Sequence, residues 1–197
     1  MFKIITVSRE FGSGGRTIGK KVAEKLNIPC YDQEIIDKIA SECDFCEEFI
    51  RERGEYAVTG SKFFNALSAT STGGLSLQDR LWIEQEKIIT DLSTKGDCVI
   101  VGRCADAILK DKAKLLKVFI HASFECRKER IVNVYGETEL PTERRLKDKD
   151  KRRKAYYQYY TDTEWGDVNN YHLALDSGEL GIDTCVELIT QAYKNLK

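Results

Sequence analysis

This sequence has almost no net charge, no long apolar run and few histidines. Its 197 residues carry 31 lysines and arginines against 32 aspartates and glutamates, which leaves a formal net charge of −1. No overall field therefore attracts nucleic acid or lipid headgroups, and any phosphate must be bound by local clusters of charge. No apolar run approaches the roughly 20 residues that a membrane-spanning helix needs, and no signal peptide precedes the first predicted strand. We expect a cytoplasmic protein whose partners include neither nucleic acid nor a membrane.

The sequence also lacks a pattern of paired cysteines. The seven cysteines are odd in number and scattered, so they do not indicate a disulfide framework. Cys43 and Cys46 form a C-x-x-C motif, which could be redox-active or supply half of a zinc site. A zinc site would need a second pair of ligands, and the only histidines are His121 and His172. We interpret the cysteines as free thiols.

The pattern of apolar segments predicts an α/β fold. Hydrophobic residues make up 42% of the sequence, which is enough for the core of one domain. Short apolar runs rich in β-branched residues predict buried strands, at 3–8, 98–102, 116–121 and 171–176, with a further short strand at 29–32. Helices are predicted between them, at 15–26, 33–40, 77–95, 105–111, 123–135, 142–160 and 184–196. Strands that alternate with helices indicate a mostly parallel sheet.

Two regions do not fit the core of this sheet. Region 41–80 has a small, polar, glycine-rich middle at 68–76, which predicts a flexible connector. Region 136–166 contains a strongly basic stretch, in which residues 143–154 include eight lysines or arginines against three acids. We therefore expect a single domain, 1–197, whose core comprises 1–40, 81–135 and 167–197.

A glycine-rich turn follows the first predicted strand and leads into a helix. The sequence from Ser8 to Thr17, SREFGSGGRT, is close to the phosphate-binding pattern G-x-x-x-x-G-K-[ST]. Glu10 stands in place of the first glycine of that pattern, and Arg16 stands in place of its lysine. The alternative interpretation is a glycine-rich turn between a strand and a helix that binds no ligand.

The residues of this turn suit the binding of ATP and Mg²⁺. The glycines allow the backbone to turn its N–H groups inward, and the following helix adds the positive end of its dipole. Arg16 can offer a forked guanidinium to phosphate oxygens, and the Thr17 hydroxyl stands where it could hold Mg²⁺. The predicted phosphate ligands are the backbone groups and side chains of the turn and the start of the helix: Gly12, Ser13, Gly14, Gly15, Arg16 and Thr17.

Polar residues follow three of the predicted strands. Ser8, Asp32 and Arg103 each lie where a strand ends. Ligands of parallel α/β sheets bind at the carboxyl ends of the strands, so these side chains could converge on one site. The alternative for Arg103 is an exposed residue at the edge of the sheet.

The basic stretch predicts either a solvated helix face or a lid. Arg152 and Arg153 are followed closely by tyrosines, a mixture that can also bind nucleic acid. Because the protein has no basic net charge, we favour a lid that closes arginines over a triphosphate. The segment 165–171, WGDVNNY, could anchor this lid or contact the nucleotide base.

The order of these motifs resembles that of the nucleoside monophosphate kinases, and more closely that of the cytidylate kinase-like family. The segments that carry the resemblance are 8–15 (SREFGSGG), 150–157 (DKRRKAYY) and 165–171 (WGDVNNY). The resemblance implies a P-loop NTPase fold with three α/β/α layers and a parallel sheet of about five strands. It also implies a helical acceptor-side insert at 41–80 and a basic lid at 136–166.

The resemblance assigns roles to individual residues. It implies that Arg103 holds the acceptor phosphate, that Lys149 and Arg152 reach phosphates from the lid, and that Arg153 assists them. Asp32 matches an aspartate that begins an acceptor-side motif in cytidylate kinases. This chain departs from the family pattern at Arg16, where those enzymes carry lysine, and after Asp32, where it reads Gln-Glu-Ile-Ile.

Three functions remain open from the sequence. The leading hypothesis is an ATP- and Mg²⁺-dependent kinase of nucleoside monophosphates with Arg16, Arg103, Arg152 and Arg153 as its catalytic cations, and CMP or dCMP as the first acceptors to test. The second is a nucleotide-binding sensor without efficient turnover. The third is a kinase of a small molecule that is not a nucleotide. Both a monomer and a homodimer are compatible with the sequence.

Overall fold

The computed structural model describes residues 1–32, 77–136, 138 and 140–196. The predicted helix at 33–40, the Cys43–Cys46 motif and the connector at 68–76 lie outside the described residues. None of the helices in the described ranges is both long enough and apolar enough to cross a membrane.

The core is a parallel sheet of five strands in the order β2-β3-β1-β4-β5. The strands are β1 (Lys3–Arg9), β2 (Cys30–Tyr31), β3 (Cys98–Val101), β4 (Lys114–His121) and β5 (Leu173–Asp176). In β1 the five residues between the two ends are buried, as are all four residues of β3, which is the pattern of strands covered on both faces. The predicted α/β fold with a five-stranded parallel sheet is therefore confirmed.

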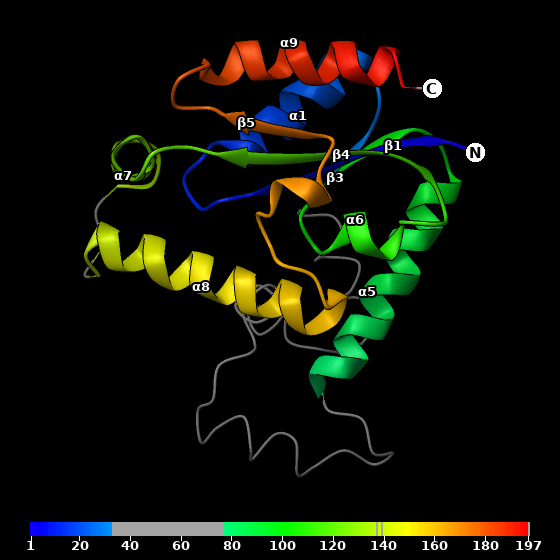
Figure 1. Ribbon diagram of the computed structural model, residues 1–197, viewed down its shortest axis with the longest axis horizontal. Helices are drawn as coiled ribbons and strands as arrows, with labels where there is room; N and C mark the ends of the chain where they lie inside the picture. The colour runs from blue at the N-terminus through cyan, green and yellow to red at the C-terminus, as the bar shows by residue number, and fades with distance from the viewer. Residues whose placement is uncertain (33–76, 137, 139, 197) are drawn as a thin grey trace.

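Helices cover both faces of the sheet (Figure 1). On one face lie α1 (Gly15–Leu26) and α9 (Gly181–Lys194), which share a core cluster with Ile5 and Val7. On the other face lie α5 (Leu77–Thr94), α6 (Ala105–Ile108) and α8 (Thr142–Thr161). Within the described ranges, the remaining helices are α7 (Phe124–Tyr135), which follows β4, and the short η1 (Val168–Asn170) before β5.

Several predicted boundaries differ from the structure, and two of the differences have local reasons. The last helix begins at Gly181, three residues before the predicted start at 184, with a left-handed glycine (φ 76°) at its first position. The predicted strand at 171–176 begins at Leu173, where pairing with β4 starts, because the chain leaves η1 only at Asn170. Asp167 caps η1 by accepting a hydrogen bond from the backbone N–H of Asn169.

Helix α8 packs on the core partly through aromatic residues, because it has no continuous apolar face. Only Leu146, Tyr156 and Tyr157 of this very polar helix are buried. The Tyr157 hydroxyl donates a 2.6 Å hydrogen bond to the carboxyl group of Asp106 on α6, which is 5% exposed. Burial raises the pKa of Asp106 above its usual range.

We predict that replacing Asp106 with Asn changes the pH dependence of stability. A carboxyl group whose pKa is raised by folding binds more protons in the folded state, so it stabilises the fold at low pH and loses that contribution as the pH rises through the folded pKa. The free energy of unfolding of Asp106→Asn, taken relative to that of the wild type, should therefore increase as the pH rises above about 4, the unfolded pKa of Asp. Urea unfolding at pH 4 to 8 measures this difference.

The matched control is Asp111→Asn, at an exposed aspartate just beyond α6. Its difference from the wild type should stay flat over the same range. A flat difference for Asp106→Asn as well would contradict the effect of burial on this carboxyl group.

Candidate active site

The loop between β1 and α1 has the geometry of an anion cradle. Gly12 and Gly14 adopt left-handed backbone conformations with φ of 81° and 78°. A Cβ atom at Gly14 would lie 2.6 Å from Cδ1 of Ile182, so this position excludes a larger residue. Gly14 is also the N-cap of α1 and offers no capping side chain, which leaves the N–H groups of the first turn available to a negatively charged ligand.

The loop is held in place by polar groups from α7 and the β5–α9 connection. Arg130 donates to the backbone carbonyl of Gly12 at 3.1 Å. The Ser177 hydroxyl donates to the carbonyl of Ser13 at 2.5 Å, and Arg130 also contacts Ser177 at 3.4 Å. These donors occupy carbonyl oxygens of the loop, so the loop is fixed without use of the N–H groups at the start of α1.

Two predicted ligands, Arg16 and Asp32, pair with one another. The Arg16 Nε lies in an ion pair with an Asp32 carboxylate oxygen at the end of β2. Nearly half of the Arg16 side chain remains exposed, and Thr17 beside it is also exposed at the start of α1. The Thr17 hydroxyl and the Asp32 carboxylate are oxygen donors of the kind that Mg²⁺ prefers.

The turn after β3 is strained and carries a buried arginine. Gly102, Arg103 and Cys104 all have positive φ values, of 76°, 61° and 53°. A non-glycine residue in this conformation costs about 1–3 kcal/mol, and such residues cluster at functional sites. Gln85 of α5, itself buried, supports the turn by donating to the carbonyl of Arg103 at 3.0 Å.

Arg103 presents an unsatisfied charge to a small cavity. Its side chain is 5% exposed, and its buried Nη1 has no hydrogen-bond partner within the described residues. A cavity of about 30 Å³ lies beside it, at the carboxyl ends of β1 and β3. Its described lining residues include three arginines (Arg9, Arg103 and Arg153) and no carboxylate. A buried cation is costly unless it is paired, so this cavity has the chemistry of an anion site.

Helix α8 docks on the glycine-rich loop through Asp150. The Asp150 carboxylate accepts the backbone N–H of Phe11 at 2.7 Å and an N–H of Arg127 at 2.5 Å. Arg127 also donates to the Phe11 carbonyl at 3.3 Å and lies 3.4 Å from the Glu10 carboxylate. Glu10, the residue in place of the usual glycine, accepts the N–H of Ala122, and burial raises its pKa. One network therefore joins the loop, α7 and α8.

The predicted cations of α8 fall into three different positions. Arg153 lines the cavity, donates to the carbonyl of Arg9 at 3.0 Å and lies 5.7 Å from the centre of the Phe11 ring. Lys149 lies 5.1 Å from the same ring centre, so it covers the loop rather than the cavity. Arg152 is exposed and does not line the cavity.

Several residues of the site were not identified from the sequence: Arg9, Gln85, Arg127, Arg130 and Ser177. A signal existed for two of them, because Arg127 and Arg130 are three residues apart on a helix that follows a strand ending at the site. The others gave no local signal. Ser177 reaches the carbonyl of Ser13 across 164 residues of sequence.

The fold is that of the P-loop kinases of known structure. A shikimate kinase from Bacteroides thetaiotaomicron superposes with a TM-score of 0.57 at 15% identity, covering 97% of this chain and 98% of its own. A gluconokinase from Sinorhizobium meliloti superposes with a TM-score of 0.55 at 18% identity, covering 98% of this chain and 95% of its own. At these identities the likeness concerns the fold alone.

Residues 4–179 match the model of the cytidylate kinase-like family, and the chain belongs to that family. A cytidylate kinase from Archaeoglobus fulgidus is 28% identical over 195 residues, 96% of this chain and 94% of that protein. One from Aeropyrum pernix is 26% identical over 187 residues, 93% of this chain and 94% of that protein. An uncharacterized protein from Eubacterium ventriosum has a TM-score of 0.72 at 28% identity, with 97% and 98% coverage. Family and fold together support nucleotide kinase activity, for which ATP is the implied donor.

We predict that Asp150→Ala destabilises the protein by about 3 kcal/mol, because it leaves the nearly buried Arg127 without its closest partner. The control is Asp148→Ala on the same helix, where the pair with Arg144 is long (3.8 Å) and exposed, and the change should stay within about 0.5 kcal/mol. Urea unfolding of both variants measures the difference. Equal losses would show that the Asp150 network does not hold the lid to the loop.

Proposed function

We propose that this protein transfers the terminal phosphoryl group of ATP to a nucleoside monophosphate in a Mg²⁺-dependent reaction, with CMP or dCMP as the first acceptors to test. The observation that carries the proposal is the buried, strained Arg103, whose Nη1 has no partner within the described residues. It faces a cavity that three arginines line next to the phosphate loop. A phosphate monoester would satisfy the Arg103 guanidinium by forked, charge-assisted hydrogen bonds.

On the donor side, the backbone N–H groups at the start of α1 and the half-exposed guanidinium of Arg16 would hold the phosphates of ATP. The Thr17 hydroxyl, with Asp32 nearby, would hold Mg²⁺, and this ion neutralises charge on the phosphate oxygens when it is bound. Arg153 belongs both to the cavity and to the face of α8 over Phe11, so it is placed to neutralise charge between the donor and acceptor phosphates.

The reaction needs no strong general base. The attacking atom would be an oxygen of the acceptor phosphate, which is already ionised near neutral pH. The work of the protein is then to align two anions and to exclude water, and positioning and charge stabilisation of this kind dominate phosphoryl transfer. The docking of α8 on the loop through Asp150 provides such a cover.

The ion pair between Arg16 and Asp32 favours a second candidate, a nucleotide-binding sensor without efficient turnover. In that case the guanidinium would stay with Asp32 and would not follow the moving phosphoryl group. The sensor should bind ATP without forming a product. A small-molecule kinase should instead hydrolyse ATP slowly, and no nucleoside monophosphate should stimulate it.

The test is ADP release from ATP and Mg²⁺ with a panel of acceptors: CMP, dCMP, UMP, AMP, GMP, shikimate and gluconate. We expect CMP or dCMP to stimulate ADP release and to yield the corresponding diphosphate. Stimulation by shikimate or gluconate alone would replace the proposal with the small-molecule kinase. Silence across the panel, with ATP binding in a parallel calorimetric titration, would favour the sensor.

We predict that Arg16→Ala and Arg103→Ala affect different substrates. Loss of Arg16 should weaken ATP binding by roughly 10- to 100-fold, the value of one or two charge-assisted hydrogen bonds. Loss of Arg103 should leave ATP binding near that of the wild type and lower kcat/KM for the acceptor roughly 100-fold. Calorimetry with ATP and steady-state kinetics with the best acceptor measure the two effects.

The control variant is Arg144→Ala, an exposed arginine of α8 that does not line the cavity. It should behave as the wild type in both measurements. If Arg103→Ala weakened ATP binding but spared acceptor kinetics, the assignment of Arg103 to the acceptor side would be wrong.

A further inference from the structure

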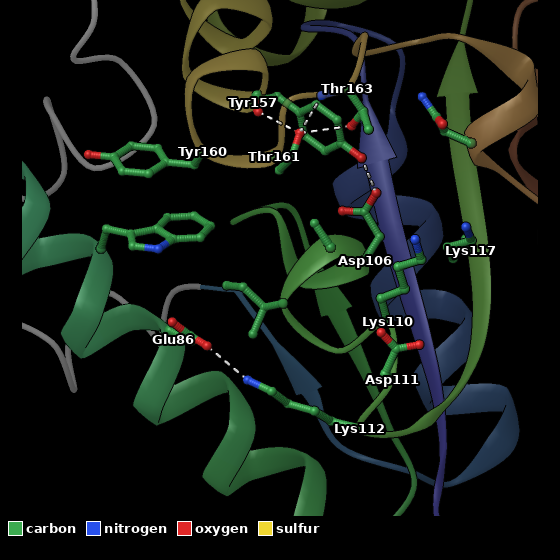
Figure 2. Close-up of a pocket in the computed structure, with 14 residues that line it drawn as sticks. Glu86, Asp106, Lys110, Asp111, Lys112, Lys117, Tyr157, Tyr160, Thr161 and Thr163 are labelled. Atoms are coloured by element: carbon green, nitrogen blue, oxygen red, sulfur yellow. Dashed lines mark hydrogen bonds and ion pairs between the residues drawn. The ribbon is translucent and has the colours of Figure 1, made fainter.

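A second and larger cavity lies on the α5/α6/α8 face of the sheet, away from the phosphate loop. Its volume is about 440 Å³, and residues of α5, α6, the 110–112 connection, β4 and the end of α8 line it (Figure 2). A cavity of this size falls within the range of small-molecule sites, about 300–1,000 Å³. Among the described lining residues, Tyr157 alone is shared between this cavity and the small cavity beside Arg103.

One wall of the large cavity carries unpaired positive charge. Lys110 and Lys117 lie on the same side, next to Asp106 (Figure 2). Neither lysine forms an ion pair within the described residues, whereas Lys112 at the edge is paired with Glu86 at 2.8 Å.

The acids of the cavity compensate this charge only in part. Asp106 accepts a hydrogen bond from the Tyr157 hydroxyl, and burial raises the pKa of Asp106. Burial therefore disfavours the negative charge that would attract the Lys117 ammonium. Glu86 is already paired with Lys112, so Asp111, on the exposed connection, is the remaining acid among the lining residues.

The opposite wall is flat and aromatic. The rings of Trp82 and Tyr160 stack with their centroids 4.3 Å apart and their planes 5° apart, and both residues line the cavity. Stacked rings offer a planar surface to a further ring. The hydroxyl groups of Thr161 and Thr163, 2.8 Å from one another, add polar groups to the same cavity.

We propose that this cavity is a second binding site, for a small molecule that combines a planar ring with one anionic group, a phosphate or a carboxylate. Lys110 and Lys117 would bind the anion, while the ring would pack against Trp82 and Tyr160. The two lysines and the aromatic wall line the large cavity and not the small cavity beside the phosphate loop. The proposal therefore stands whether or not the acceptor is a nucleotide.

The probe is pyridoxal 5′-phosphate, which has a planar ring, a phosphate and an aldehyde that condenses with a lysine amine to an imine and water. Borohydride then reduces the imine to a stable amine, and peptide mass mapping identifies the lysine. At low, saturable probe concentrations we expect the label on Lys117 or Lys110. Pyridoxal, which has the same ring without the phosphate, should need at least a tenfold higher concentration. Label on Lys149, beside Phe11, would place the probe at the phosphate loop and overturn the proposal.

Fluorescence provides a second measurement without covalent chemistry. The chain has two tryptophans, so in a Trp165→Phe protein Trp82 reports alone on the cavity. Pyridoxal phosphate should quench it saturably, and adding Lys110→Ala and Lys117→Ala should weaken binding at least tenfold.

Two single variants separate a specific loss of binding from a general effect of removing lysines. Lys194→Ala, at an exposed lysine in the last turn of α9, should leave the titration unchanged. Lys110→Ala alone changes only an exposed side chain and should still weaken binding if the double variant folds poorly. Equal quenching in the lysine variants and in Lys194→Ala would overturn the proposal.

Discussion

The carboxylate of Asp150 is the group on which the arrangement of the active site depends. Helix α8 is rich in like charges and buries only three residues, so an apolar face cannot hold it against the core. Asp150 instead accepts both the N–H of Phe11 and the guanidinium of Arg127, which fixes the helix, the loop and α7 together. Once the helix is fixed in this way, Arg153 reaches the cavity and Lys149 covers the Phe11 ring.

This arrangement concentrates cations around two different tasks. Arg127 is paired with Asp150 and Glu10, so it belongs to the framework. Arg103 lines a cavity together with Arg9 and Arg153, and its buried Nη1 has no hydrogen-bond partner within the described residues, so an anion that enters the cavity would satisfy it. The strained turn at 102–104 also directs Arg103 toward the cavity, because Gln85 binds the backbone carbonyl of Arg103 and not its guanidinium. The strained backbone and the unpartnered Arg103 nitrogen are therefore both located where the proposed acceptor phosphate would bind.

Much of the fold and part of the site could be predicted from the sequence, because they depend on local patterns. The β-branched runs of β1, β3 and β4 and the glycines of the loop carry their own signals. Gln85 and Ser177 could not be found in this way, because any buried amide or hydroxyl can serve once the chain brings it to an unpaired carbonyl. The left-handed conformations of Arg103 and Cys104 were equally hidden, since neither residue type favours them.

The two departures from the usual phosphate-loop pattern have physical explanations in this network. Glu10 replaces a glycine because its carboxylate binds Arg127 and the N–H of Ala122, so the position supports α7 and β4 rather than a tight turn. Arg16 replaces a lysine at a position where it must also meet Asp32. A lysine presents its donors from one nitrogen, so Asp32 and a phosphate would have to share a single point charge. The arginine pairs with Asp32 through Nε, and its planar guanidinium carries further N–H donors on a side chain that is nearly half exposed. An arginine can therefore pair with Asp32 and donate to a phosphate at the same time, so the ion pair is compatible with turnover as well as with a sensor, and product formation distinguishes the two.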